Sequence, residues 1–236
     1  MTTKHLLAAF FLFSAVIFSA QAQEVTEEEE EGYVYEQYFD KKSDVYTRVG
    51  LSWAGAVGWD SHSYKTKRIL SYSFGIGYTH SLTYKGDVNV NAEVNLSRVG
   101  FRVTNPGGAM DLEELTMNYI QIPVIVRYYP IKEFKAAYVG AGPQIAFKSG
   151  DVQIKTQGSG QFLLMDNAVN SPDLALVGVA GVHFAKKLDL GLELRYQHSL
   201  NKFLNPFPEA RHSVFQVSFF FPAEALLNIG LYFPIF

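Results

Sequence analysis

The sequence contains no cysteine. A secreted chain without cysteine has no disulfide bonds, no thiolate metal site and no cysteine that could carry a lipid behind a signal sequence. Covalent cross-links therefore contribute nothing to its stability, which has to come from packing and backbone pairing. A sheet that closes into a barrel supplies such stability, because closure leaves no unpaired edge strand.

Long apolar runs are also absent, with one exception at the N-terminus. Met1–Lys4 carries a positive charge, Leu6–Phe18 is apolar, and Ala20-Gln21-Ala22 fits the small-x-small pattern of a cleavage site. The apolar run is shorter than the roughly 20 residues that a membrane-spanning helix needs. We therefore predict a signal peptide over residues 1–22, cleaved near Ala22, in preference to a membrane anchor.

A strong excess of either charge is missing as well. The formal net charge is -3, and loss of residues 1–22 makes it -4 because Lys4 leaves without any carboxylate. A mildly acidic protein has no basic footprint for nucleic acid. The acidic run Glu27–Glu31 follows the cleavage site, and we predict that residues 23–44 form a solvated acidic N-terminal linker. A docking tail for a basic partner is the alternative interpretation.

What the sequence does contain is alternation between apolar and polar residues, clearest in Leu188–Leu200. Its even positions are almost all large and apolar, and its odd positions are Asp, Gly, Glu, Arg, Gln and Ser. Neighbouring residues of a β-strand point to opposite faces, so the segment predicts a strand with one apolar and one polar face. At about 3.3 Å per residue it is long enough to cross a bilayer at the usual tilt of a barrel strand.

Eight segments are strand candidates, and tight turns alternate with long loops between them. Such alternation is typical of outer-membrane barrels, whose short turns lie in the periplasm and whose long loops lie outside. We therefore predict an all-β fold over residues 45–236: an eight-stranded antiparallel up-and-down transmembrane β-barrel with a filled lumen and periplasmic termini. The predicted strands are Val45–Trp59, Ile69–Tyr84, Val88–Val103, Leu115–Tyr129, Lys135–Lys148, Asp173–Ala185, Leu188–Asn201 and Arg211–Phe221.

A secreted soluble barrel of the lipocalin type has the same period with its apolar face inward, so alternation alone does not separate the two folds. Strands of about 12–15 residues favour the membrane barrel, because ordinary strands have about 5–6. Aromatic residues near the strand ends also favour it, since an aromatic girdle lies at each membrane interface. These residues are Trp59, Tyr84, Tyr128, Tyr129, Tyr196 and Phe221.

Four stretches between Tyr119 and Asn201 carry a family resemblance. They are Tyr119–Tyr129 (YIQIPVIVRYY), Tyr138–Pro143 (YVGAGP), Val177–Gly181 (VGVAG) and Leu192–Gln197 (LELRYQ). In combination they resemble the PorT-like outer-membrane β-barrel family of Bacteroidota. The resemblance implies an eight-stranded barrel in the outer membrane. It also implies a link to secretion, since some members assist the type IX secretion system, and it brings no catalytic residues.

The resemblance bears on two prolines and on the C-terminus. Pro123 and Pro143 lie inside predicted strands, where each removes a ladder donor, and we interpret them as bulges or register adjustments. Residues 222–236 form either the closing strand or a periplasmic tail. Their end, Asn228–Phe236, resembles the aromatic-ended signal that the barrel assembly machinery recognises. A ten-stranded barrel that also uses Tyr33–Phe39 would put both termini outside.

Five charged residues fall on the polar faces of the predicted strands: Arg48, Glu93, Arg127, Glu193 and Arg195. The interior of an eight-stranded barrel is filled by side chains. Buried charges have to pair there, because breaking a buried ion pair costs about 3–5 kcal/mol. We therefore predict that these five residues form a structural charge network in the lumen. A proton or ion path is the alternative interpretation.

No catalytic, cofactor-binding or metal residue is predicted. Four of the six histidines precede a serine, but strand neighbours point to opposite faces, so a His–Ser dyad on one strand needs a spacing of two. His-x-Ser does not occur. His183 and His198 stand alone on their predicted strands, and no set of metal ligands accompanies them.

The connection Ser149–Pro172 is the best candidate for a surface function. Val152–Lys155 and Phe162–Met165 flank Gly158-Ser159-Gly160, which predicts a hairpin beyond the membrane. Long loops often carry binding residues, and an inert hairpin is the alternative.

The leading hypothesis is a non-enzymatic structural or accessory component of the outer membrane, PorT-like, that supports secretion or assembly. The second is an adhesin or ligand-binding barrel that acts through residues 149–172. A lipid hydrolase and a small pore are less favoured. The expected partners are outer-membrane lipid, the barrel assembly machinery and a secretion-system or surface partner. We expect an integral outer-membrane monomer without nucleic acid or cofactor.

Overall fold

The computed structural model describes residues 43–58, 65–83, 86–104, 112–131, 137–156, 162–165, 169–185, 190–202 and 210–223. The predicted signal peptide, most of the acidic linker and the C-terminal assembly signal lie outside the described residues. Within those ranges no helix has the length and apolar character to cross a membrane.

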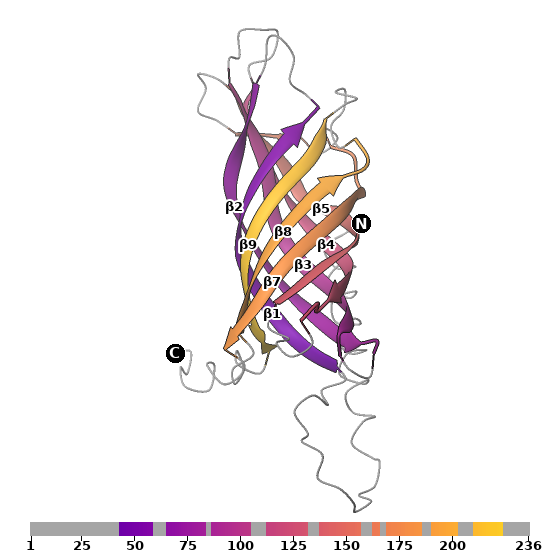
Figure 1. The fold of residues 1–236 in the computed structure, drawn as a ribbon. Helices are drawn as coiled ribbons and strands as arrows, with labels where there is room; N and C mark the ends of the chain where they lie inside the picture. Colours follow the sequence, from indigo (N-terminus) through magenta and orange to yellow (C-terminus); the bar gives the residue numbers. More distant parts are fainter. Residues whose placement is uncertain are drawn as a thin grey trace, which may run out of the picture. The chain divides into compact units, whose positions relative to one another are not determined.

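Eight long antiparallel strands follow one another around a closed barrel, and the ring is completed where the last strand pairs with the first (Figure 1). A ninth, short strand, β6, pairs with β5 outside this ring. The predicted eight-stranded antiparallel barrel is confirmed. The strands are β1 (Ser43–Val57), β2 (Lys65–Ser81), β3 (Val88–Thr104), β4 (Leu112–Tyr128), β5 (Ala137–Thr156), β6 (Phe162–Met165), β7 (Asp173–Ala185), β8 (Leu190–Ser199) and β9 (Arg211–Pro222).

The strand that closes the barrel is β9. It pairs with β1 from Tyr46↔Pro222 to Val57↔Arg211, while the other edge of β1 pairs with β2. The ring is therefore closed by β9, which ends at Pro222, and residues 224–236 lie outside the described residues. Both edges of β1 are occupied, so the ring also has no place for the strand Tyr33–Phe39 of a ten-stranded barrel.

Within the membrane-spanning part of the barrel, the buried charged residues of the strands point into the lumen and large apolar residues point outward. On β8, Glu193 is fully buried, whereas the next outward residue, Leu194, is 43% exposed. Large apolar residues are exposed in the same way on all eight strands of the ring, for example Leu70, Leu96 and Phe219. A lipocalin-type barrel has the opposite arrangement. The soluble alternative is therefore excluded, because so large an exposed apolar surface requires lipid around it.

The lipid-facing band has sharp edges on β3, β4 and β5. The lower edge, on the side of the short turns, follows the cross-strand partners Val88, Tyr128 and Val139. The upper edge, on the side of the long connections, follows the cross-strand partners Leu96, Ile120 and Phe147. On β3 this band covers nine residues, Val88 to Leu96, which agrees with the roughly 9–11 residues that a tilted transmembrane strand needs.

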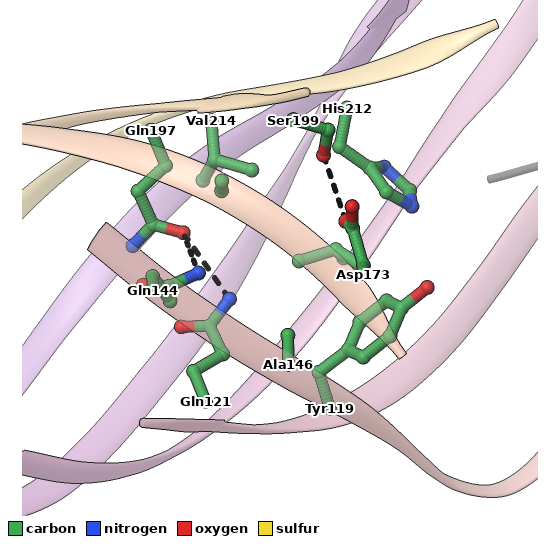
Figure 2. A pocket seen from close by; sticks show the side chains of 11 residues that line it. Tyr119, Gln121, Gln144, Ala146, Asp173, Gln197, Ser199, His212 and Val214 are labelled. Atoms are coloured by element: carbon green, nitrogen blue, oxygen red, sulfur yellow. Dashed lines mark hydrogen bonds between the residues drawn. The ribbon is translucent and has the colours of Figure 1, made fainter. Parts of the chain in front are cut away.

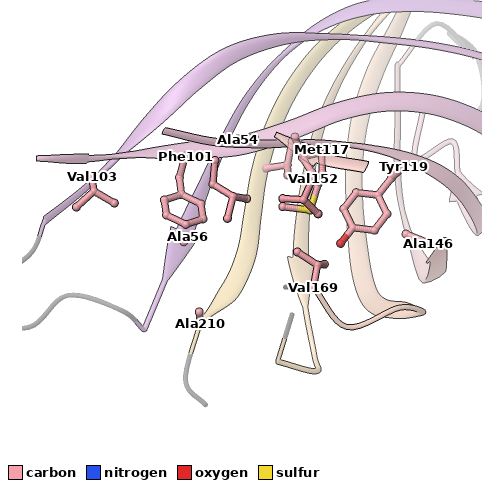
Figure 3. Close-up of a cluster of buried hydrophobic side chains, with 13 residues drawn as sticks. Ala54, Ala56, Phe101, Val103, Met117, Tyr119, Ala146, Val152, Val169 and Ala210 are labelled. Atoms are coloured by element: carbon pink, nitrogen blue, oxygen red, sulfur yellow. The ribbon is translucent and has the colours of Figure 1, made fainter. Parts of the chain in front are cut away.

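Beyond Leu96 the polarity of the two faces of β3 inverts. The outward residues become Arg98 and Arg102, and the inward residues become Val99, Phe101 and Val103, all buried. These residues belong to an apolar lumen cluster that fills this end of the barrel (Figure 3). Its members are Ala54, Ala56, Val99, Phe101, Val103, Leu115, Met117, Tyr119, Ala146, Val152, Val169, Ala210 and Val214.

This inversion explains why β2, β4 and β5 extend beyond their predicted ends on this side. β2 begins at Lys65 instead of Ile69, β4 begins at Leu112 instead of Leu115, and β5 continues to Thr156. Outside the membrane a barrel wall has water on its outer face, so its apolar residues have to turn inward. The pairing continues through this region although the pattern that predicted the strand is reversed.

The predicted hairpin in the long connection is confirmed. Val152 pairs with Met165 and Lys155 pairs with Phe162, so β5 and β6 form a ribbon. The other edge of its β5 arm, from Gln153 to Thr156, pairs with β4. Gly150, with φ 82°, precedes the ribbon next to a register shift between β4 and β5. A positive φ is a conformation that glycine adopts without the steric cost of a side chain.

Two expectations about single residues are wrong. The register of β4 with β5 runs unshifted from Ile122↔Ile145 through Pro123↔Gln144, and the register of β5 with β7 runs unshifted through Pro143↔Leu176, so neither proline marks a bulge. Tyr129 does not belong to the aromatic girdle either. It is buried in the lumen, because its neighbour Tyr128 takes the outward position.

Candidate functional site

The structure brings all five predicted charged residues together in the lumen, each with a side chain no more than 3% exposed. They come from four strands: Arg48 from β1, Glu93 from β3, Arg127 from β4, and Glu193 and Arg195 from β8. Each occupies an inward position of its strand. Strands far apart in the sequence therefore contribute to one charge network across the narrow interior.

Glu93 is held mainly by Arg195. The two guanidinium nitrogens Nη1 and Nη2 of Arg195 each lie 2.8 Å from a different carboxylate oxygen of Glu93. This bidentate geometry is the strongest form of an arginine–carboxylate contact. The Tyr46 hydroxyl donates to Oε1 of Glu93 at 2.6 Å, and the Asn95 amide donates to Oε2 at 2.9 Å.

Glu193 accepts hydrogen bonds from all three arginines. Nη1 of Arg48 lies 2.9 Å from its Oε1, Nη2 of Arg127 lies 2.7 Å from its Oε2, and Nη2 of Arg195 lies 2.7 Å from its Oε1. The Tyr138 hydroxyl also donates to Oε2 at 2.7 Å. Each oxygen of both carboxylates thus accepts at least one hydrogen bond, as buried charges require.

The network contains three guanidinium groups and two carboxylates, so one positive charge has no carboxylate of its own. Aromatic rings surround the guanidinium of Arg127. Its Cζ lies 4.6 Å from the ring centroid of Tyr138, 5.3 Å from that of Tyr46 and 5.9 Å from that of Phe220. The negative faces of these rings stabilise a desolvated cation.

Sequence reasoning missed the hydroxyl and amide partners of the network. Tyr46 lies two residues before Arg48, and Asn95 lies two residues after Glu93, so both share the inward face with a predicted charge. That spacing was a usable signal. Tyr138 belongs to a segment that is apolar on both faces, and its direction could not be derived from alternation.

Glutamines fill the next part of the lumen. The side-chain amides of Gln121 and Gln144 both donate to Oε1 of Gln197 at 3.2 Å (Figure 2). Gln197 donates to Oε1 of Gln216 at 3.4 Å. Gln216 in turn bonds to Ser73. These four glutamines form a glutamine layer, and each residue in it is buried.

A small cavity beyond the glutamine layer contains an aspartate, a serine and a histidine. Figure 2 shows Asp173, Ser199 and His212 side by side, with the Ser199 hydroxyl donating to Oδ2 of Asp173 at 2.7 Å. A catalytic serine would donate to a histidine nitrogen instead. All three residues are buried in the lumen, away from lipid, and the cavity has room for about one water molecule.

The other end of the lumen is closed by aromatic rings. Tyr138 and His183 contact each other, and each also contacts the rings of Tyr129 and Phe220. The His183 and Phe220 centroids lie 4.9 Å apart. Among the described residues, no group of three or more His, Cys, Asp or Glu side chains could hold a metal ion.

A closed antiparallel ring, an apolar outer band and a polar interior define this chain as a β-barrel of the outer-membrane class. The chain belongs to the family of the outer membrane protein beta-barrel domain, whose model matches residues 64–205. The match includes the four stretches from Tyr119 to Gln197 that carry the family resemblance. Family and fold together place the protein in the outer membrane.

Three solved outer-membrane proteins match the chain at 12% sequence identity. Neisserial surface protein A matches 76% of this chain and 98% of its own, with a TM-score of 0.47. Ail, the attachment invasion locus protein of Yersinia pestis, matches 76% and 97% with a TM-score of 0.41. OprG from Pseudomonas aeruginosa matches 76% and 93% with a TM-score of 0.43. No curated protein matches the chain.

Proposed function

We propose that the protein is a non-enzymatic structural or accessory barrel of the outer membrane that supports secretion or assembly, in the manner of PorT-like proteins. The observation that carries this proposal is the filled lumen. Aromatic rings, the charge network, the glutamine layer and the apolar lumen cluster succeed one another along the barrel. A barrel packed in this way acts through its outer surface and its extracellular end.

The same packing argues against the two less favoured functions. A pore needs a continuous aqueous path, and the charge network crosses the lumen with side chains at most 3% exposed. A lipid hydrolase needs its nucleophile on the lipid face. Ser199 lies inside the barrel and bonds to Asp173.

The proposal is tested by removing the gene and measuring the amount of protein that the cells secrete. We expect secretion to fall, and expect the full chain to restore it. Equal secretion with and without the gene would refute the secretion role. A planar bilayer with the purified barrel should show no single-channel conductance, and steady channels would contradict the non-conducting barrel.

A second candidate function, adhesion or ligand binding, is favoured by the ribbon of β5 and β6. β6 lies outside the closed ring and contributes no strand to barrel closure. Shortening the ribbon removes β6 and the outermost β4–β5 pairs, from Leu112 to Thr116, but keeps the pairs of β5 with β4 from Asn118 to Tyr128 and all pairs of β5 with β7. Replacing residues 153–164 by Asn-Gly would join Val152 to Met165, which already face each other, through a two-residue turn.

The shortened variant separates the two functions. If the protein supports secretion through its barrel, the variant restores secretion in the deletion strain as well as the full chain does. If the protein is an adhesin, cells with the variant lose adherence to coated surfaces while their barrel remains folded. A variant that retains full adherence would show that the ribbon is not the adhesive surface.

A further inference from the structure

The outer face of β2 and β3 carries three basic residues directly above the apolar band. Outward residues of β3 run from Val88 to Leu96, and the next two outward side chains are Arg98 and Arg102. Lys67 of β2 is the cross-strand partner of Arg102, and both are exposed. We call Lys67, Arg98 and Arg102 the basic cluster.

The charges of the basic cluster are only partly compensated. Arg102 pairs with Glu114 at 2.8 Å. Arg98 donates to two neutral oxygens, Oγ1 of Thr116 at 3.1 Å and Oε1 of Gln153 at 3.3 Å. In the ranges that the structure describes, neither Arg98 nor Lys67 forms an ion pair with a carboxylate.

The arrangement of Lys67 opposite Arg102 is unfavourable by itself. Like charges that face each other across neighbouring strands destabilise a sheet. Among the described residues, Glu114 offsets one of the three positive charges, and the other two have no carboxylate partner there. An anion bound between β2 and β3 would relieve this repulsion.

The position of the cluster indicates what kind of anion fits. Leu96, which is 53% exposed, is the outward residue that immediately precedes Arg98. A ligand that occupies both places has an acyl chain against the apolar band and an anionic group immediately above it. Asn118 and Ser149 continue the row from Arg98 across β4 and β5 and offer neutral hydrogen-bonding groups beside the anion.

We propose that the basic cluster binds the phosphate group of an outer-leaflet lipid. A guanidinium presents a planar fork of donors that matches phosphate oxygens bidentately. Arg98 and Arg102 supply two such forks, and Lys67 adds a point charge. Basic residues at a membrane surface attract anionic lipid with about 1 kcal/mol each, which corresponds to about fivefold in affinity per residue. The proposal rests on the outer-membrane location and is independent of a role in secretion.

Native mass spectrometry of the purified protein in detergent tests the site with bis-phosphorylated lipid A and its dephosphorylated form as probes. We expect the phosphorylated lipid to bind more tightly. The double variant Arg98→Gln/Arg102→Gln should weaken its binding by about tenfold or more, with little change for the dephosphorylated lipid. Equal binding of the two lipids to the unmodified protein would overturn the proposal.

Two control variants separate the site from general charge and from folding. Arg211→Gln removes an exposed arginine from β9, opposite Val57, and should leave lipid binding unchanged. Arg98→Lys/Arg102→Lys retains the charge but loses the planar forks, so it should weaken binding, although less than the double glutamine variant does. If Arg211→Gln weakened binding as much as the double variant did, the cluster would not be a site. If inorganic pyrophosphate displaced the lipid at equal concentration, the ligand would be a soluble phosphate and the lipid assignment would fail.

Discussion

Arg195 and Glu193 show how the interior of the barrel depends on single side chains. Arg195 bridges both carboxylates of the network, and Glu193 receives all three arginines and one tyrosine hydroxyl. Neither side chain has access to water. Removing one member therefore leaves the others charged and unpaired in a region of low dielectric constant, which costs more than the lost contact itself.

The first prediction concerns Glu193. Glu193→Ala leaves three guanidinium groups with one carboxylate, and we expect the free energy of unfolding to fall by about 3–5 kcal/mol. Urea unfolding of the barrel in lipid vesicles measures it. Glu114→Ala removes a carboxylate from an ion pair whose arginine is half exposed and should cost at most about 1 kcal/mol. Equal effects of the two substitutions would mean that the lumen is not sealed from water.

A second prediction concerns the edge of the apolar band on β4. Val124 and Asn118 are both outward and exposed, but Val124 lies in the middle of the band and Asn118 lies just above it. Val124→Arg should cost about 2–4 kcal/mol, and Asn118→Arg about 0–1 kcal/mol. The same urea titration measures both. A harmless Val124→Arg would show that lipid does not contact this face.

Alternation predicted the charged residues of the network but not their aromatic partners. A charge within an alternating strand has only one stable direction, into the lumen, so Arg48, Glu93 and Arg127 could be assigned from sequence. An aromatic side chain is stable in the lumen and at the interface alike. Tyr129 was therefore placed in the girdle, although Tyr128 beside it already occupied the outward position.

At the scale of elements, β3 and β4 are each built for two environments. In the part of each strand that lies within the apolar band, the apolar residues point outward to lipid. In the part beyond the band, the apolar residues point into the lumen, as they do in a soluble barrel. The inversion was not predicted because the period of two is the same on both sides of it, and only the identity of the apolar face changes. The element ends were misplaced for this reason, whereas their order and pairing were predicted correctly.

The pairing of β4 with β5 depends on the close approach of Gly142, which yields a third prediction. A Cβ at Gly142 would lie 1.8 Å from the carbonyl oxygen of Val124, so Gly142→Ala forces the two strands apart. We expect a loss of about 1–3 kcal/mol in unfolding free energy.

Gly178 of β7 supplies the matched control, because a Cβ there meets no atom within 4 Å. Gly178→Ala should change stability by no more than about 0.5 kcal/mol. If both alanine variants unfolded at the same urea concentration as the unmodified protein, the close approach of β4 and β5 would be incorrect.

At the scale of the whole molecule, the closed ring and the filled lumen make one cooperative unit. Every strand of the ring has two neighbours, and the charge network ties β1, β3, β4 and β8 together across the interior. A fourth prediction follows for outer-membrane fractions on a detergent gel. The unheated protein should run as a fast, compact band that slows after boiling. A protein that has the same gel mobility before and after boiling, and that is found in the soluble periplasmic fraction, would contradict the closed membrane barrel.

The seam between β1 and β9 also determines the order in which the chain can mature. The first and last strands of the ring are partners, with Val49 opposite Phe219 and Trp53 opposite Phe215. Ring closure therefore waits for β9, which follows the other seven strands of the ring in the sequence. Until Arg211–Pro222 arrives, β1 and β8 both present open backbone edges next to an apolar surface, which is the state in which strands aggregate. A chain without β9 cannot close the ring, so it needs protection in the periplasm until that strand is available.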